Sequence, residues 1–150
     1  MKLKHNLLPL LNKHFGYSEF RENQLQIINC VLENKNTLVI MPTGGGKSLC
    51  YQLSAIAAEG TAIIISPLIA LMKNQVDVLK GLFDVDGVAN VFNSSLTQTE
   101  REIVKKQIND GTTKLLYLAP ESLTKQKNIY FLKNQKISFV AVDEAHCISE

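Results

Sequence analysis

The sequence predicts an α/β fold in which a parallel sheet is covered by helices on both faces. Five short apolar runs divide the 150 residues, and most are continuously apolar rather than alternating, as in strands buried on both sides. Segments with helical apolar spacing separate these runs, and alternation of strand with helix favours parallel pairing. The five expected strands are 37–41, 61–66, 87–92, 114–119 and 137–143.

Two helices are expected ahead of the first strand, at roughly 3–15 and 20–34, with a turn at 16–18 between them. The second helix carries an apolar stripe at helical spacing, which predicts that it packs against a core. That stripe consists of Leu25, Ile28 and Leu32.

Two further helices have recognisable starts. Ser66 and Pro67 are the residue types of a helix N-cap and a first helical position. Thr97 with Glu100 forms a capping-box pattern, and the helix that it opens should end near Asp110. The helix after Ser66 is expected to bury an apolar stripe of Leu68, Leu71, Met72, Val76 and Leu79.

The composition is that of an ordinary globular chain, with 45% hydrophobic and 20% charged residues and a length that fits one domain. The net charge of +2 says little about partners. No apolar run approaches the roughly 20 residues that cross a bilayer, and the start lacks a cleavage site for secretion. Cys30, Cys50 and Cys147 are too far apart for a zinc motif and predict reduced thiols. We therefore expect a cytoplasmic protein that is not secreted.

The segment 42–48, PTGGGKS, has the composition of a phosphate-binding loop. It lies between an expected strand and an apolar helical segment, which is the context that such a loop requires. Its glycines let successive backbone N–H groups face one anion, and the amino end of the next helix faces the same phosphates. Lys47 supplies a charge for the β- and γ-phosphates and Ser48 a hydroxyl for Mg²⁺. We expect ATP with Mg²⁺, bound by Thr43, Gly44, Gly45, Gly46, Lys47 and Ser48.

An acidic pair follows the last expected strand, within the run Asp143, Glu144, Ala145 and His146. The carboxyl ends of strands in an open α/β sheet form its ligand-binding edge. At that edge Asp143 can hold Mg²⁺ while Glu144 takes a proton from the attacking water. The expected catalytic residues are therefore Lys47, Asp143, Glu144 and His146.

Together these motifs resemble the first RecA-like domain of RecQ-type DNA helicases, a group within helicase superfamily 2. The resemblance covers nearly the whole chain, and its most specific parts are PTGGGKSLCYQ at 42–52 and DEAHCIS at 143–149. Met41 stands where the general loop pattern has glycine, but the T-G-x-G-K-S version at 43–48 is widespread in helicase-type ATPases. The resemblance implies a P-loop NTPase fold and an ATP-dependent 3′-to-5′ DNA helicase acting in replication, recombination and repair.

The stretch 15–24, FGYSEFRENQ, resembles the adenine-recognition motif of the same family. By that resemblance Gln24 hydrogen-bonds the adenine edge, while Tyr17 and Arg21 flank the plane of the ring. The chemistry agrees, because a primary amide matches the N6 donor and N7 acceptor of adenine. Aromatic and guanidinium planes also stack on bases.

Contacts with DNA, and a nucleoid association if the protein is bacterial, are implied by the resemblance alone. In the resembling helicases the segment ISPLIALMKNQ, here 65–75, touches the backbone of single-stranded DNA, and NSS at 93–95 lies near the same track. Ser66 and Asn93 are therefore candidate nucleic-acid contacts, although a simple helix start explains Ser66 equally well. The segment APE at 119–121 resembles another DNA-facing motif, with Ala119 where many superfamily members have threonine.

The resemblance stops at the end of the sequence, where relatives continue with a further strand and a second RecA-like domain. We therefore expect 1–150 to be a partial ATP-binding domain, incomplete at its C-terminal end. The absent strand should leave unpaired backbone and exposed apolar faces beside the strand that ends at Asp143. Relatives supply an arginine finger from the second domain, and only Arg21 and Arg101 are present here. The isolated chain should bind ATP with Mg²⁺ but hydrolyse it poorly.

Two alternatives remain open from the sequence. One is another superfamily 2 ATPase, such as an RNA helicase, which the DEAH motif and Gln24 do not exclude. The other is a truncated, non-catalytic module that binds nucleotide or DNA.

Overall fold

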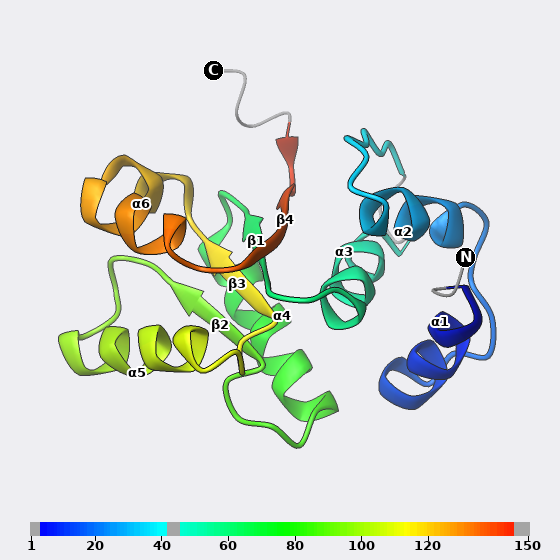
Figure 1. Cartoon of the computed structure of the whole chain (residues 1–150), viewed down its shortest axis with the longest axis horizontal. Helices are drawn as coiled ribbons and strands as arrows, with labels where there is room; N and C mark the ends of the chain where they lie inside the picture. Colours follow the sequence, from blue (N-terminus) through cyan, green and yellow to red (C-terminus); the bar gives the residue numbers. More distant parts are fainter. Residues whose placement is uncertain (1–3, 42–45, 146–150) are drawn as a thin grey trace. The chain divides into compact units, whose positions relative to one another are not determined.

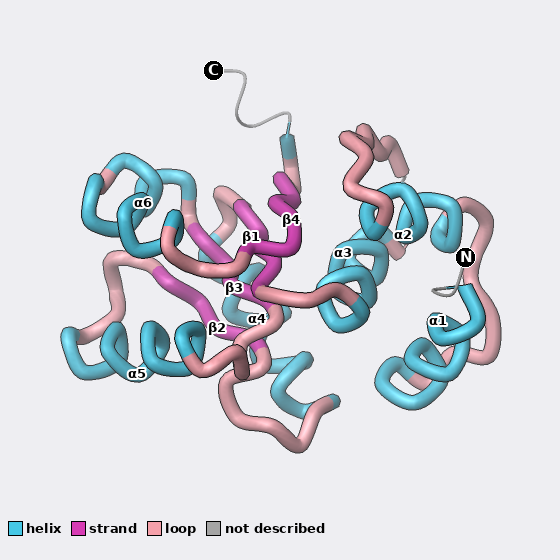
Figure 2. The backbone as a smooth tube through the Cα atoms, viewed as in Figure 1, coloured by secondary structure: helices cyan, strands magenta, loops and turns pink. Residues whose placement is uncertain are grey.

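The structure is a computed structural model that describes residues 4–41 and 46–145 (Figure 1). The chain divides into two compact units, residues 1–58 and residues 59–150. Unit 1 is helical, and all strands of the described chain belong to unit 2 (Figure 2). Within the described residues, no helix has both the length and the apolar character needed to cross a membrane. The single domain expected across both units stays a prediction.

The described residues of unit 1 form three α-helices, α1 (Lys4–Leu10), α2 (Gln24–Leu32) and α3 (Lys47–Ala57). The first continues as a π-helical turn, η1 (Leu11–Phe15), and ends at Gly16 in a left-handed conformation. The expected helix at 3–15 is thus confirmed for the described residues. The second helix begins later than expected, because Glu22 has a φ of 25° and cannot continue a helix.

The core of unit 1 lies between these three helices. Leu25 and Leu32 of the expected stripe pack against it, and Ile28 is fully buried within it. Cys30 and Cys50 are free thiols, and burial raises the pKa of the Cys50 thiol to about 11. The buried members of this core are Leu7, Leu11, Ile28, Cys50 and Leu53.

The strand expected at 37–41 is wrong. This segment has no regular secondary structure, and the side chains of Leu38 and Ile40 are 83% and 90% exposed. No strand among the described residues pairs with it. A single extended segment leaves its backbone N–H and C=O groups without ladder partners, so an apolar sequence does not make it a strand by itself.

Residues 59–145, the part of unit 2 that the structure describes, form a four-stranded sheet, and this confirms the expected α/β fold with four of the five strands. Its strands are β1 (Thr61–Ile65), β2 (Ala89–Phe92), β3 (Leu115–Leu118) and β4 (Ile137–Val142). All pairs are parallel, and the spatial order is β2-β3-β1-β4.

Helices join these strands and cover both faces of the sheet. The helices of unit 2 are α4 (Ile69–Leu82), α5 (Gln98–Asn109) and α6 (Gln126–Lys133), with a 3₁₀ turn, η2 (Pro120–Thr124), before α6. The step from β1 to β2 crosses the sheet in the opposite direction to the next two steps. Since crossovers are right-handed, α4 lies on one face while α5 and α6 lie on the other.

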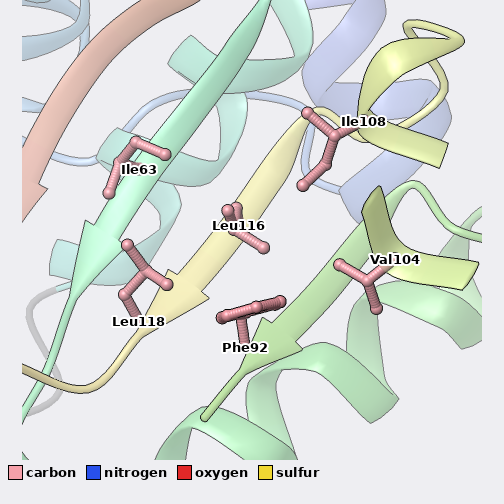
Figure 3. Packing of buried hydrophobic residues seen from close by; sticks show 6 residues of the cluster. All are labelled: Ile63, Phe92, Val104, Ile108, Leu116 and Leu118. Atoms are coloured by element: carbon pink, nitrogen blue, oxygen red, sulfur yellow. The ribbon is translucent and has the colours of Figure 1, made fainter. Parts of the chain in front are cut away.

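The core under α5 and α6 joins side chains from the sheet and from α5 (Figure 3). Alternate strand positions point to the opposite face and are buried as well, as Ile64, Leu115 and Tyr117 show. The cluster under α5 and α6 consists of Ile63, Phe92, Val104, Ile108, Leu116 and Leu118.

The capping box at the start of α5 is confirmed. The Glu100 N–H donates to Thr97 Oγ1 at 3.2 Å, and the Thr97 N–H donates to Glu100 Oε2 at 2.8 Å. The helix ends at Asn109, with Asp110 as its C-cap, close to the expected position.

The helix start expected at Ser66 is wrong, because α4 begins at Ile69 with Leu68 as its N-cap. The Ser66 N–H donates to the Leu118 carbonyl at 3.1 Å, so the backbone at Ser66 still belongs to the sheet. Met72, Val76 and Leu79 of the expected stripe are buried, whereas Leu68 and Leu71, near the helix start, are exposed.

The strand that ends before Asp143 was expected to lie beside unpaired backbone and exposed apolar surface. Among the described residues β4 pairs only with β1 and forms an edge of the sheet. Val140 and Val142 are 56% and 43% exposed as a result. The apolar exposure expected beside this strand is therefore found.

Candidate functional site

The amino end of α3 is the part of the expected phosphate loop that the structure describes. Gly46 is the N-cap, with a φ of 80° and a ψ of 29°, and Lys47 and Ser48 form the start of the helix. Both side chains are half-buried. The first turn of a helix has backbone N–H groups without helical partners and a positive dipole end, which suits phosphate. Pro42, Thr43, Gly44 and Gly45 lie outside the described residues.

Gln24 contacts this helix start directly, although it lies 22 residues earlier in the sequence. Its Nε2 donates to the Gly46 carbonyl at 3.1 Å, and its Oε1 accepts from the Arg21 N–H at 2.9 Å. The Gln24 amide is therefore fixed through both its oxygen and its nitrogen, and the residue is only 2% exposed. The sequence predicted Gln24 as an adenine contact but gave no sign of this bond to Gly46.

A hollow of about 80 Å³ lies beside this contact within unit 1. It brings together all three residues of the expected adenine motif with Gly46. Tyr17 is 52% exposed, so part of its side chain is open to a ligand. Glu19 and Leu49 also line the hollow and were missed, although Glu19 lies inside the motif and Leu49 directly follows the loop. The lining residues are Tyr17, Glu19, Arg21, Gln24, Gly46 and Leu49.

In unit 2 the carboxyl ends of the four described strands are aligned in register. Phe92, Leu118, Ile65 and Val142 share one register across the sheet. The residues that follow therefore line a single edge in the order Asn93, Ala119, Ser66 and Asp143. At a strand spacing of about 4.8 Å, this edge is roughly 14 Å long from the first strand to the last.

Asp143 is fixed at this edge by its backbone and its side chain. Its N–H donates to the Ile65 carbonyl at 2.8 Å, and its Oδ1 accepts from the Glu144 N–H at 2.9 Å. Asp143 is 8% exposed. Glu144 has a φ of 55°, a left-handed conformation that is uncommon outside glycine and occurs often at functional sites. His146 lies outside the described residues.

The two candidate nucleic-acid contacts are buried at the same edge. Ser66 is 3% exposed, and its Oγ accepts from the Leu68 N–H at 3.3 Å. Asn93 is 7% exposed, and its Oδ1 accepts from the Ser95 N–H at 2.8 Å. Both side chains shape the turns that leave the sheet, while Ser94 and Ser95 are exposed beside them.

The structure thus gathers the expected site residues in two groups. Gln24, Arg21, Tyr17 and Gly46 meet in unit 1, and Asp143 and Ser66 lie side by side in unit 2. Lys47 belongs to the first unit and Asp143 to the second. A shared cavity between these two side chains stays a prediction.

Comparison with known proteins gives consistent matches. The DEAD/DEAH box helicase family matches residues 21–150. The chain is 47% identical over 149 residues to the ATP-dependent DNA helicase RecQ of Pasteurella multocida, covering 99% of the chain and 23% of that relative. It is 45% identical over 149 residues to RecQ of Bacillus subtilis, covering 97% and 24%. It is 38% identical over 152 residues to the ATP-dependent helicase SGS1 of Saccharomyces cerevisiae, covering 95% and 10%. The chain therefore spans about a quarter of the bacterial RecQ relatives.

Proposed function

Because this chain belongs to the DEAD/DEAH box helicase family, we propose that it is the ATP-binding part of a RecQ-type DNA helicase. One observation carries the proposal. The three residues of the expected adenine motif line a hollow together with Gly46, the N-cap of α3. Base and phosphate groups of one nucleotide can therefore be held by a single unit of the chain.

The phosphates would lie at the amino end of α3, facing the backbone N–H groups of its first turn and the Lys47 ammonium. Ser48 and Asp143 would hold Mg²⁺. The largely buried carboxylate of Asp143 fits this role, because a buried negative charge is stabilised by a cation beside it. Bound Mg²⁺ would supply charge neutralisation on the β- and γ-phosphates.

Glu144 would act as the general base, and its place directly after Asp143 supports this role. His146 completes the expected catalytic set within the same motif. An arginine finger would neutralise charge on the γ-phosphate, whereas Arg21 lines the hollow of unit 1 and Arg101 lies on α5. We therefore attribute that group to a second RecA-like domain, and expect slow hydrolysis without it.

Adenine would be recognised in the hollow. Gln24 would bond the base edge, while Tyr17 and Arg21 would contact its plane. If so, Gln24→Ala should reduce the preference for ATP over GTP, measured by competition with a labelled nucleotide. An unchanged ATP-to-GTP ratio would remove Gln24 from base recognition.

The nucleic acid would lie along the carboxyl edge of unit 2, near Ser66 and Asn93. Relatives whose names state a DNA helicase activity support DNA as the substrate. A cytoplasmic location, where bacterial DNA is found, follows from the same proposal. Single-stranded DNA should stimulate ATP hydrolysis more than RNA of the same length, in a protein that joins this chain to a second motor domain. Stronger stimulation by RNA would favour an RNA helicase instead.

The ATP site can be tested with a fluorescent ATP analogue and two lysine variants. Lys47→Ala should weaken binding at least tenfold, since it removes the charge that faces the phosphates. Lys80→Ala is the matched control, because Lys80 is exposed on α4 and should leave binding unchanged. Undiminished binding to Lys47→Ala would contradict the proposal.

A further inference from the structure

The Gln24 side chain makes two contacts that fix its orientation. Oε1 faces an N–H group, that of Arg21, and Nε2 faces a C=O group, that of Gly46. A flipped amide would place oxygen against oxygen at Gly46 and N–H against N–H at Arg21. The burial of Gln24 makes such a loss costly, because water cannot replace the broken bonds.

The contact with Gly46 is also a close packing contact. A Cβ atom added at Gly46 would lie 2.2 Å from Gln24 Nε2, and Gly46 has a positive φ. The backbone conformation therefore favours glycine here, and a larger residue would force the Gln24 amide to move. The position of Gly46 and the position of the Gln24 amide determine one another.

The Gly46 carbonyl is the point at which the loop enters the helix. As the N-cap residue of α3, Gly46 precedes Lys47 directly. The Cys50 thiol also donates to this carbonyl, at 3.6 Å. A shift of Gly46 would therefore move the first turn of α3, which carries the phosphate-binding groups.

We propose that Gln24 is a positioning residue for phosphate binding as well as a contact for the base. Through its bond to the Gly46 carbonyl it holds the amino end of α3 in the geometry that receives phosphates. An amide has two N–H groups and two acceptor lone pairs, so the two internal bonds leave one of each for a base edge. This inference rests on the proposed ATP site and assigns a second role to one of its residues.

A ligand without a base separates the two roles. Inorganic tripolyphosphate with Mg²⁺ contacts the phosphate-binding groups but offers nothing to a base-recognition residue. Gln24→Met keeps the side-chain length and removes the amide. It should weaken tripolyphosphate binding about tenfold, the factor expected for one buried hydrogen bond. ATP binding should fall at least as much, measured by calorimetry for both ligands.

Three further variants make the test specific. Gln26→Met changes an exposed glutamine of the same helix and should leave both affinities unchanged. Ile28→Val weakens the core of unit 1 without touching Gly46, and should change tripolyphosphate affinity by less than about twofold. Gln24→Glu keeps the acceptor for the Arg21 N–H but sets a carboxylate oxygen against the Gly46 carbonyl. It should weaken tripolyphosphate binding at least as much as Gln24→Met, at a temperature where circular dichroism shows every variant folded.

Weaker ATP binding with unchanged tripolyphosphate binding in both Gln24 variants would overturn the positioning role and leave the base contact. Equal losses in Ile28→Val would overturn it too, because they would trace the effect to stability. A failure of the proposed ATP site would give a different binding result. In that case the unaltered chain would bind neither ligand, or Lys47→Ala would bind both as well as the unaltered chain does.

Discussion

Two apolar segments of similar sequence differ in the structure. Residues 61–65, TAIII, form β1 between two neighbouring strands, and Ile64 is completely buried. Residues 37–41, TLVIM, form no strand, and Ile40 is 90% exposed. Composition does not distinguish the two segments, but pairing does. An apolar run shows where a strand can form, and the strands available beside it decide whether it forms.

The largest expected effect contrasts these two segments. Ile64→Ala should lower the free energy of unfolding by about 3 kcal/mol, because it leaves a cavity in a packed sheet. Ile40→Ala is the matched change in the exposed segment and should cost less than about 0.5 kcal/mol. Urea denaturation followed by circular dichroism measures both. Equal losses would mean that residues 37–41 are packed as tightly as β1.

A second effect concerns the helix start that follows the exposed segment. Gly46→Ala should lower stability by about 2 kcal/mol and weaken ATP binding, since the new Cβ meets Gln24 and the backbone has a positive φ. Gly81→Ala is the control, because Gly81 lies in α4 with open space around it. That change should be neutral or slightly stabilising in thermal melts. A neutral Gly46→Ala would show that this junction is loose.

A smaller effect concerns the start of α5, which the sequence predicted correctly. Thr97→Ala removes the capping box of α5 and should cost about 1 kcal/mol in thermal denaturation. Thr99→Ala, two residues later on the exposed side of the same helix, should cost nothing measurable. If both variants melted alike, the capping box would not stabilise the helix.

Local signals account for what the sequence predicted well. The capping box of α5 needs only Thr97 and Glu100, and the four sheet strands are short apolar runs with helical segments between them. The helix start predicted at Ser66 was wrong because the Ser66 N–H bonds to the carbonyl of Leu118 in β3. These two residues are 52 positions apart in the sequence, so no local pattern indicates their contact. The hydrogen bond between Gln24 and Gly46 could not be predicted from the sequence either, because the sequence does not show which distant backbone group a side chain will contact.

We propose, as the central claim, that the Asp143 carboxylate holds the Mg²⁺ ion that accompanies ATP. Calorimetric titration of ATP with and without Mg²⁺, in the unaltered chain and in Asp143→Asn, tests it most directly. Mg²⁺ should tighten ATP binding in the unaltered chain, and Asp143→Asn should remove most of that gain while metal-free binding stays the same. A full Mg²⁺ effect in Asp143→Asn would contradict the claim.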